Sequence, residues 1–358
     1  PYSGTVGSAS NVGSYAITQG TLTAGANYLI TYTAANLTVN PAALTVTASA
    51  QATTYGTTYT LGTTSFSSVG LLNGDSVTSV NLTYAGNTVV PGTAAVNAYA
   101  ISANNAAGVR LSNYTLTYQS GVLTVNPKLI NVIANSATMV YADATLPTLT
   151  YQNVTGLVNG DVVTGSLTTL ATAFNGSAGS ASNVGVYGIT QGSVTAGSNY
   201  VITYTPGSLT VTPANLTVTA SNQSTIYGSL LVLPQDGLTT IGLKNGDYVA
   251  SATILYNGNQ VVPGTGNVGT YAAALAINSA SGVGLSNYVV SYTPGTLVVN
   301  KALLTVTAVA DAKFVSQTDL QGSATNCAGT TCTGGYAGAM ISGFKNSDSV
   351  NSGALGAA

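Results

Sequence analysis

Apolar and polar residues alternate along most of the chain, with the period of two that predicts β-strands. Residues 28–32, YLITY, place two tyrosines and an isoleucine on one face and a leucine and a threonine on the other. The same pattern recurs at 114–118, 200–204 and 288–292. Because this face is consistently large and apolar, we expect it to pack on a core, where each tyrosine hydroxyl would need a hydrogen-bond partner.

Shorter alternating runs surround these segments. They predict further strands with inward-facing pairs Leu37 and Val39, Leu123 and Val125, Leu209 and Val211, Leu297 and Val299, then Leu44 and Val46, Ile130 and Val132, Leu216 and Val218, and Leu304 and Val306. Two to four residues, such as Ser120-Gly121, separate each tyrosine-rich run from the next run, which predicts a hairpin. No stretch shows helical periodicity of useful length, so we expect an all-β protein.

Several landmarks recur at a fixed spacing, which indicates tandem modules. The Leu-x-Val runs begin 86 to 88 residues apart, at Leu37, Leu123, Leu209 and Leu297. Asn-Gly-Asp recurs at 73–75, 159–161 and 245–247, and we expect a turn there in which glycine adopts positive φ. Asn-Tyr pairs lie at 27–28, 113–114, 199–200 and 287–288, and single tyrosines recur at Tyr55, Tyr141 and Tyr227.

These landmarks divide the chain into 1–40, the C-terminal half of a module; 41–126, 127–212 and 213–299, three whole modules; and 300–358, an N-terminal half with an insert. About seven short strands are expected in each whole module. That favours an antiparallel β-sandwich resembling immunoglobulin-like domains. A smaller, mixed β-rich module is the alternative. A continuous β-helix would repeat about every 20 residues and is disfavoured.

The two half-modules fit one cyclic pattern. Landmarks counted from 300–358 into 1–40 keep the spacing of 159–187 to within one residue. We therefore expect the 358-residue unit either to repeat in tandem within a longer chain or to meet the next subunit head to tail. An arbitrary fragment whose ends match by chance is the alternative. Because the chain does not start with Met, its true N-terminus is expected to be missing.

The junctions between modules are short and contain proline. In LTVNPAALTVTA, residues 37–48, one module closes and the next opens with almost no linker. Proline fixes its own φ and biases the preceding residue toward extended conformations. We therefore predict little hinge motion at these junctions, and a stiff rod of modules.

The composition excludes several classes of function. Only 4% of the residues are charged and the net charge is −2, so no basic surface for nucleic acid or anionic membranes is expected. No run approaches the roughly 18 apolar residues of a membrane-spanning helix. Hydroxyl and amide groups must hydrate this surface, which favours an extracellular, surface-anchored or polymeric protein.

Candidate chemistry is sparse. Cys327 and Cys332 lie within the insert, and in an exported protein their spacing favours a local disulfide. A metal site would need more ligands, and the sequence has no histidine to supply them or to activate a serine nucleophile. We therefore predict no cofactor and no enzymatic activity.

The carboxylates follow the repeat. Asp75, Asp161, Asp247 and Asp348 occupy equivalent turns one module apart, and we interpret them as turn-capping residues rather than acid–base pairs. Calcium bound at the junctions is an alternative, although such sites gather more carboxylates than these modules offer.

The motifs GL-x-NGD-x-V, VG-x-Y-x-I, SNY-x-I-x-Y, GTL-x-V and LTV-x-A…YG resemble the MBG and YDG repeat families over essentially the whole chain. Those are mostly-β repeats of large secreted bacterial surface proteins, including haemagglutinin-like adhesins. The resemblance implies an extracellular stalk or adhesive filament, and it supplies no catalytic residues. The chain departs from the pattern at 309–345, where Phe314-Val315 replaces Tyr-Gly, and directly after it, where Asn346-Ser347-Asp348 replaces Asn-Gly-Asp.

Two functions are expected from these observations. The first is a structural repeat segment of a secreted bacterial fibre or adhesin stalk, whose partner is another copy of itself. The alternative is an adhesin region that recognises glycan or a host surface through variable loops, especially 316–340 with Tyr336. A scaffold region of a larger enzyme is a third possibility.

Overall fold

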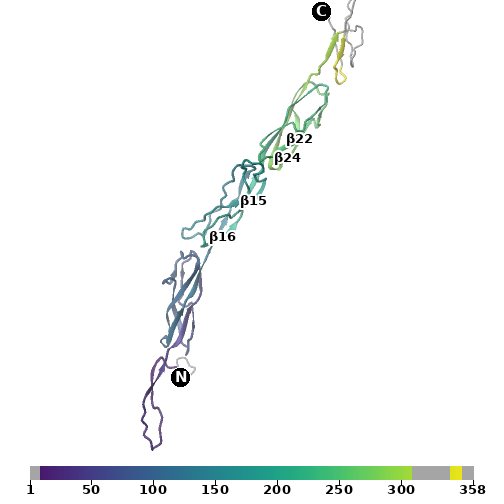
Figure 1. Ribbon diagram of the computed structural model, residues 1–358. Helices are drawn as coiled ribbons and strands as arrows, with labels where there is room; N and C mark the ends of the chain where they lie inside the picture. The colour runs from purple at the N-terminus through teal and green to yellow at the C-terminus, as the bar shows by residue number, and fades with distance from the viewer. Residues whose placement is uncertain (1–8, 309–338, 349–358) are drawn as a thin grey trace, which may run out of the picture. The chain divides into compact units, whose positions relative to one another are not determined.

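The structure is a computed structural model that describes residues 9–308 and 339–348 (Figure 1). The described residues form strands and loops with two short 3-10 helices, so the all-β expectation is confirmed. The chain divides into two compact units. Unit 1 comprises residues 1–135, 149–168 and 189–207, and unit 2 comprises 136–148, 169–188 and 208–358. The predicted module 127–212 contributes strands to both units, and the predicted module boundaries stay a prediction.

Unit 1 contains thirteen of the described strands and one 3-10 helix. These are β1 (Gly13–Ile17), β2 (Ala35–Val39), β3 (Ala42–Ala48), β4 (Gln51–Thr54), β5 (Tyr59–Thr60), β6 (Phe66–Val69), β7 (Ser76–Thr83), β8 (Val89–Val90), β9 (Asn97–Val109), η1 (Leu111–Asn113), β10 (Tyr114–Gln119), β11 (Gly121–Asn126), β12 (Lys128–Ile133) and β16 (Tyr200–Thr205).

The other strands belong wholly or mainly to unit 2, apart from β14 (Thr168–Thr169) at the boundary. They are β13 (Ala137–Val140), β15 (Gly185–Thr190), β17 (Gly207–Thr212), β18 (Ala214–Ala220), β19 (Gln223–Ile226), β20 (Leu231–Val232), β21 (Leu238–Ile241), β22 (Tyr248–Tyr256), β23 (Val261–Val262), β24 (Gly269–Val283), η2 (Leu285–Asn287), β25 (Tyr288–Thr293), β26 (Gly295–Asn300), β27 (Thr305–Ala308) and β28 (Ala339–Ser342).

The first and last strands of a module run parallel and side by side. In 41–126, β3 pairs with β10 and β4 pairs with β11, and in both pairs the partners are 72 residues apart. The pairs β3/β10 and β4/β11 therefore keep the same parallel alignment. The first pair belongs to the sheet β10-β3-β6, and the second pair belongs to the sheet β4-β11-β9-β7. The sheets are thus mixed rather than wholly antiparallel. Residues 41–126 contain nine strands rather than about seven, because β5 and β8 form an extra two-residue pair.

The predicted hairpin after the tyrosine-rich strand is wrong. β10 and β11 lie in different sheets, and the chain crosses between them at Ser120-Gly121. A Cβ at Gly121 would lie 2.5 Å from the carbonyl oxygen of Ala48, so this close approach of two crossing chains requires glycine. A Cβ at Gly207 would lie 2.8 Å from the Asn135 carbonyl oxygen, and one at Gly295 would lie 2.7 Å from that of Ala220. The pairing partner is a strand 72 residues earlier, which the short spacing cannot reveal.

The predicted inward faces are buried in the whole modules. The buried cluster of unit 1 contains Leu44, Val46, Ile101, Leu123 and Tyr114, and it continues into the next module through Ile130 and Tyr200. A second cluster in unit 2 contains Leu233, Ile254, Leu275, Leu297 and Val299. In unit 1 the core therefore passes through the junction at Pro127 without interruption.

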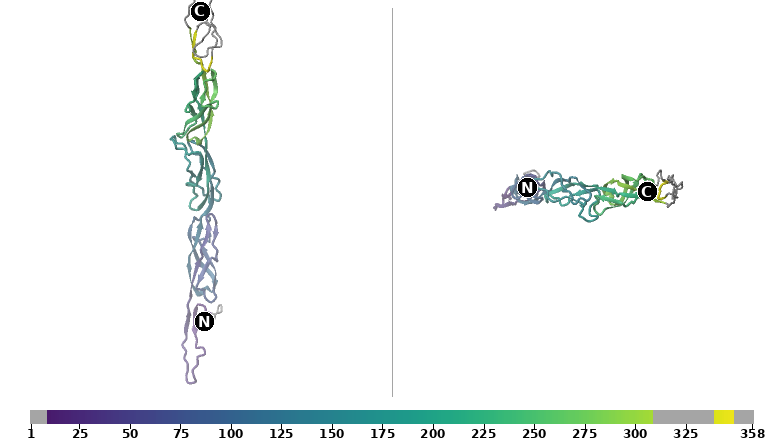
Figure 2. Two further views of the ribbon diagram at one scale, coloured as in Figure 1. Left: turned by 90° about the vertical axis from the view of Figure 1, so that its right-hand side faces the viewer. Right: turned by 90° about the horizontal axis from the view of Figure 1, so that it is seen from above.

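The two half-modules do not bury these faces. The strand predicted at 28–32 is absent, and β1 and β2 form a two-stranded sheet by themselves (purple in Figures 1 and 2). Tyr28 is 77% exposed, whereas Tyr114, Tyr200 and Tyr288 are at most 8% exposed. The physical reason is the missing neighbour: each buried tyrosine strand pairs with the opening strand of its own module, and 9–39 contains no opening strand.

Candidate functional site

The repeated polar groups meet where one module follows another. Within 9–308 and 339–348, no cluster of three or more His, Cys, Asp or Glu side chains could hold a metal ion. No helix in the same residues has the length and apolarity needed to cross a membrane. The candidate site is therefore the contact between modules. We call each contact a joint and name it by its aspartate.

The Asn-Gly-Asp motif forms the tight turn that the sequence predicts. At 159–161, Asn159 and Gly160 have φ values of 57° and 79°, and the Asp161 N–H donates to the Val158 carbonyl at 3.0 Å. Two consecutive positive φ values with this hydrogen bond define a type I′ turn. The same turn recurs at 73–75, 245–247 and 346–348, where Ser347 replaces glycine at a φ of 66°.

At 159–161, 245–247 and 346–348 the turn directs its aspartate toward the neighbouring module, so the predicted turn-capping role is wrong for Asp161, Asp247 and Asp348. At the Asp161 joint, Tyr55 of the preceding module donates its hydroxyl to Asp161 Oδ2 at 2.9 Å. Tyr200, from the same module as the aspartate, donates to the same oxygen at 2.8 Å. The two tyrosine rings meet edge to face, with centroids 5.5 Å apart and planes at 80°. One carboxylate therefore holds two modules together through two hydroxyl groups.

The Asp247 joint of unit 2 repeats this geometry. Tyr141 and Tyr288 donate to Asp247 Oδ2 at 2.7 and 2.9 Å, and their ring centroids are 5.4 Å apart at 81°. Tyr141 is completely buried. A hydrogen bond to a charged group contributes about 1.5–3 kcal/mol, so these contacts are strong for their size.

A second contact uses the asparagine of each Asn-Tyr pair. The Val96 N–H donates to Asn199 Oδ1 at 2.9 Å in unit 1, and the Val184 N–H donates to Asn287 Oδ1 at 2.9 Å in unit 2. The same bond joins Val12 to Asn113 at 3.0 Å. The tyrosine hydroxyl of the pair also accepts from the backbone before the turn, as Tyr200 does from Val158 N at 3.0 Å. The Asp161 and Asp247 joints are therefore each fixed at two separate points.

Burial keeps Tyr141, Tyr200 and Tyr288 protonated. Burial is the main cause that raises the pKa of Tyr141 and Tyr288, and the neighbouring Asp247 carboxylate raises it further. The pKa of Tyr200 is raised in the same way by burial and by Asp161. The hydroxyls therefore stay hydrogen-bond donors at neutral and mildly alkaline pH.

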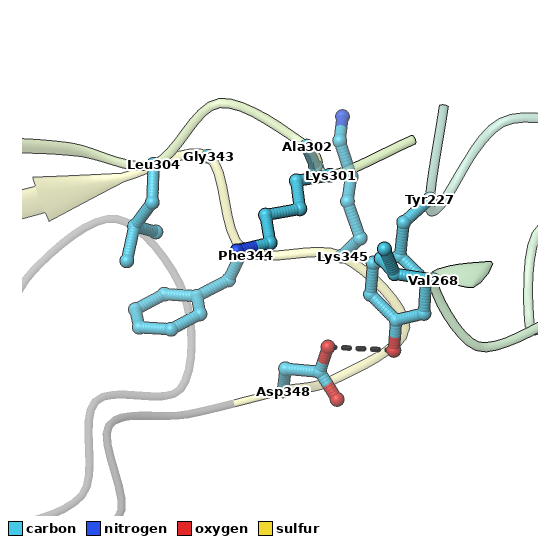
Figure 3. Close-up of a pocket in the computed structure, with 9 residues that line it drawn as sticks. All are labelled: Tyr227, Val268, Lys301, Ala302, Leu304, Gly343, Phe344, Lys345 and Asp348. Atoms are coloured by element: carbon cyan, nitrogen blue, oxygen red, sulfur yellow. Dashed lines mark hydrogen bonds between the residues drawn. The ribbon is translucent and has the colours of Figure 1, made fainter. Parts of the chain in front are cut away.

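The Asp348 joint has only part of this set. Tyr227 donates to Asp348 Oδ2 at 2.7 Å, as Figure 3 shows. Asn346 Nδ2 donates to the Gly264 carbonyl at 2.8 Å, and Asn159 makes the equivalent bond to Gly92 at 3.2 Å. Beside these contacts lies an open pocket lined by Tyr227, Val268, Lys301, Ala302, Leu304, Gly343, Phe344, Lys345 and Asp348.

The Asp75 joint uses a different partner. Tyr114 donates to Asp75 Oδ2 at 2.9 Å, but the other partner is Arg110, whose Nε lies 3.0 Å from Oδ1 as an ion pair. No hydrogen bond of good geometry reaches Oδ1 from the described residues, although the Asp75 side chain is only 1% exposed. The charge of Arg110 therefore compensates Oδ1, while the Tyr114 hydroxyl satisfies Oδ2.

The remaining predicted residues fall into two groups. Cys327, Cys332 and Tyr336 lie outside the described residues, so the local disulfide and the glycan-binding loop stay predictions. Asp143 does cap a turn, since its Oδ2 accepts from the Val140 N–H at 2.9 Å. Sequence reasoning assigned no role to Tyr55, Tyr141 and Tyr227. The signal that could have identified them is that they recur every 86 residues, as the Asn-Gly-Asp motif does.

Comparisons with known proteins agree with this repeated all-β architecture. The MBG domain (YGX type) family matches residues 2–38, 44–124, 130–210 and 216–298. The chain belongs to this family, which confirms the resemblance drawn from its motifs. MBG repeats are typical of repeat-type surface or adhesin-like proteins.

Two further comparisons add little. A solved structure, the I9–I11 tandem from titin, is similar at 8% identity over 73% of this chain and 98% of that chain, with a TM-score of 0.18. No curated protein gave a significant match.

Proposed function

We propose that this chain is a non-enzymatic structural segment of a secreted bacterial fibre or adhesin stalk, in which the joints transmit tension between modules. The supporting observation is the tyrosine–aspartate bond between consecutive modules, which recurs at Asp161, Asp247 and Asp348. A junction of one or two residues links consecutive modules covalently, and the contacts of the joint restrain bending at that junction. Membership of the MBG family supports the surface location.

Single-molecule pulling on the full chain tests the mechanical role. The variant Y55F/Y141F/Y227F removes three hydroxyls that cross joints and leaves the rings. We expect the peak unfolding force to fall because each joint loses a bond to a charged acceptor, worth about 1.5–3 kcal/mol. The matched control is Y99F/Y187F/Y271F, whose hydroxyls donate to backbone oxygens four residues earlier within their own modules. Equal forces for the two variants would refute the mechanical role.

Labelling tests the location. Antibodies against the folded chain should label intact bacteria that produce it, and protease added outside the cells should remove the label. Labelling that appears only after lysis contradicts a stalk. The glycan-binding alternative stays open, and a glycan array with the full chain would distinguish it from a purely structural role.

A further inference from the structure

Among the described residues, the Asp348 joint has one tyrosine instead of two. Asp161 and Asp247 each accept two tyrosine hydroxyls, whereas among the described residues Asp348 accepts only that of Tyr227. In the complete joints the second tyrosine comes from an Asn-Tyr pair and is the first residue of β16 (Tyr200) or β25 (Tyr288).

The pocket beside Asp348 matches the surroundings of such a tyrosine. Repeat spacing relates its residues Tyr227, Val268, Leu304 and Phe344 to Tyr55, Val96, Ile130 and Leu157. Tyr55 and Ile130 are buried members of the unit 1 cluster, which also contains Tyr200, and Val96 and Leu157 are partly buried and pack against that cluster. Tyr55 and Ile130 are 5% and 2% exposed. In Figure 3 the Tyr227 hydroxyl points at Asp348, as that of Tyr55 does at Asp161.

Among the described strands, the opening strand next to the pocket has a neighbour on one edge only. β3 lies between β10 and β6, and β18 lies between β25 and β21. β27, at the same place in the repeat, pairs only with β28 among the described strands. Leu304 and Val306 are 43% and 50% exposed, while their counterparts Leu44, Val46, Leu216 and Val218 are completely buried.

Residues 9–39 expose the complementary half. Tyr28 and Leu37 are 77% and 57% exposed, whereas the counterparts of Leu37, at 123, 209 and 297, are completely buried. Residues 28–33 keep the strand pattern of β10, β16 and β25 but pair with no strand. In strand addition, an extended segment with an apolar face pairs with an exposed strand edge. Residues 28–33 have the pattern of such a segment, and β27 has such an edge among the described strands.

We propose that the Asp348 joint binds residues 27–33 of a second copy of this chain. The repeat fixes the register, because Tyr114, Tyr200 and Tyr288 lie opposite Ala42, Lys128 and Ala214. Tyr28 of the second copy therefore lies opposite Ala302, and residues 28–33 run parallel to 302–307. The Tyr28 hydroxyl donates to Asp348 and accepts from the Lys345 N–H, and Asn27 Oδ1 accepts from the Val268 N–H. This inference rests on the proposed function, since it describes how such a segment would extend.

The sequence at the next joint supports this assembly. The position of Arg110 is Ala24, Ala196 and Gly284 in the other repeats. In the joined pair, the tyrosine position of the module preceding Asp75 is Phe314, which lies outside the described residues and has no hydroxyl. A joint whose preceding module supplies a tyrosine therefore has a small residue at the position of Arg110. The joint whose preceding module supplies Phe314 has the arginine, which pairs with Asp75.

Disulfide trapping in the full chain tests the register. In a background with Cys327 and Cys332 replaced by serine, L29C/L303C puts thiols on directly opposed, outward-facing positions of the new strand pair. Both leucines are exposed, at 95% and 83%, so the substitutions leave the cores intact. Mild oxidation should give dimers and longer covalent chains. The variant L29C/L304C is the control, because a shift of one residue moves one thiol to the other face.

A second control shows that the geometry permits a bond. L129C/V201C occupies the equivalent pair inside one module, since Leu129 lies opposite Val201 in β12 and β16. It should form a disulfide within each chain, whether or not chains associate. If this bond forms while L29C/L303C gives no product between chains, or closes within one chain, the proposal is wrong.

Sedimentation of chains with native cysteines, kept reduced, gives an independent readout. The wild-type chain should form longer oligomers as its concentration rises. Y28A should weaken association roughly 30-fold, the loss typical of a buried aromatic anchor. Y15A, which alters another exposed tyrosine of 9–39, should change it little. A wild-type chain that stays monomeric, or equal loss in both variants, contradicts the proposal. The pulling experiment on joints within one chain is unaffected by either result.

Discussion

Residues 114–119 and 28–33 have the same pattern of tyrosines and alternating apolar residues but different structures. The first segment is β10, paired in parallel with β3, and Tyr114 is buried against the Asp75 turn. The second forms no strand, and Tyr28 is 77% exposed. The comparison shows that alternation only makes a segment suitable for a strand. A partner from the other half of the module is needed to form it.

The largest difference is expected when the two tyrosines are truncated. Y114A removes a ring that is 8% exposed, and we expect a loss of about 3–5 kcal/mol in the free energy of unfolding. Y28A should change stability by about 0.5 kcal/mol or less in dilute, monomeric protein. Urea unfolding followed by circular dichroism measures both. Similar losses would mean that residues 28–33 are packed in the monomer.

The next largest effect concerns Arg110, which distinguishes the Asp75 joint from the others. R110A leaves a carboxylate with a 1% exposed side chain without its ion-pair partner. The arginine is itself 29% exposed, so solvent screens part of the interaction, and we expect a loss of about 1–3 kcal/mol. The double variant R110A/D75N removes the uncompensated charge and should recover part of this stability. No recovery would show that Arg110 acts through packing alone.

A smaller effect is expected at the asparagines. N199A removes the acceptor of the Val96 N–H, and we expect a loss of about 1 kcal/mol. N27A changes the equivalent asparagine of the half-module and should leave the unfolding of dilute protein unchanged. Comparing the two unfolding midpoints under identical conditions measures the contribution of this contact.

The smallest effect is expected from pH between neutrality and pH 10. Tyr141 and Tyr288 have pKa values raised above the ordinary 10.0, because burial disfavours the charged form. A raised pKa in the folded state contributes stability that is fully present below pH 10 and is lost as pH rises through the folded value. The melting temperature should therefore be flat with respect to tyrosine ionisation and fall only above pH 10. A fall that begins well below it would show that these hydroxyls are exposed.

Much of this architecture could be predicted from the sequence, because turns and faces are local properties. The Asn-Gly-Asp turns, and the inward faces of residues such as Leu44 and Leu209, agree with the prediction. The hairpin at Ser120-Gly121 and the strand at 28–32 were wrong, because pairing depends on a strand about 72 residues earlier. Alternation states which face is apolar, but not which strand lies beside it.

The candidate site was only half predicted for a related reason. Asp161 and Asp247 were identified as equivalent turn residues, but their bonds to tyrosines cross from one module to the next. Tyr55 and Asp161 are far apart in sequence, and no local pattern connects them. The only signal in the sequence was that both residues recur with the same spacing. The structure was needed to show that they are in contact.

The most direct test of the account is a double-mutant cycle across one joint. Y55F, D161A and the double variant are unfolded in urea, and the coupling free energy is obtained from the four stabilities. Because Tyr55 donates directly to Asp161, we predict a coupling of about 0.5–3 kcal/mol. Stability losses that add within about 0.3 kcal/mol would show that the two modules are neighbours without being joined.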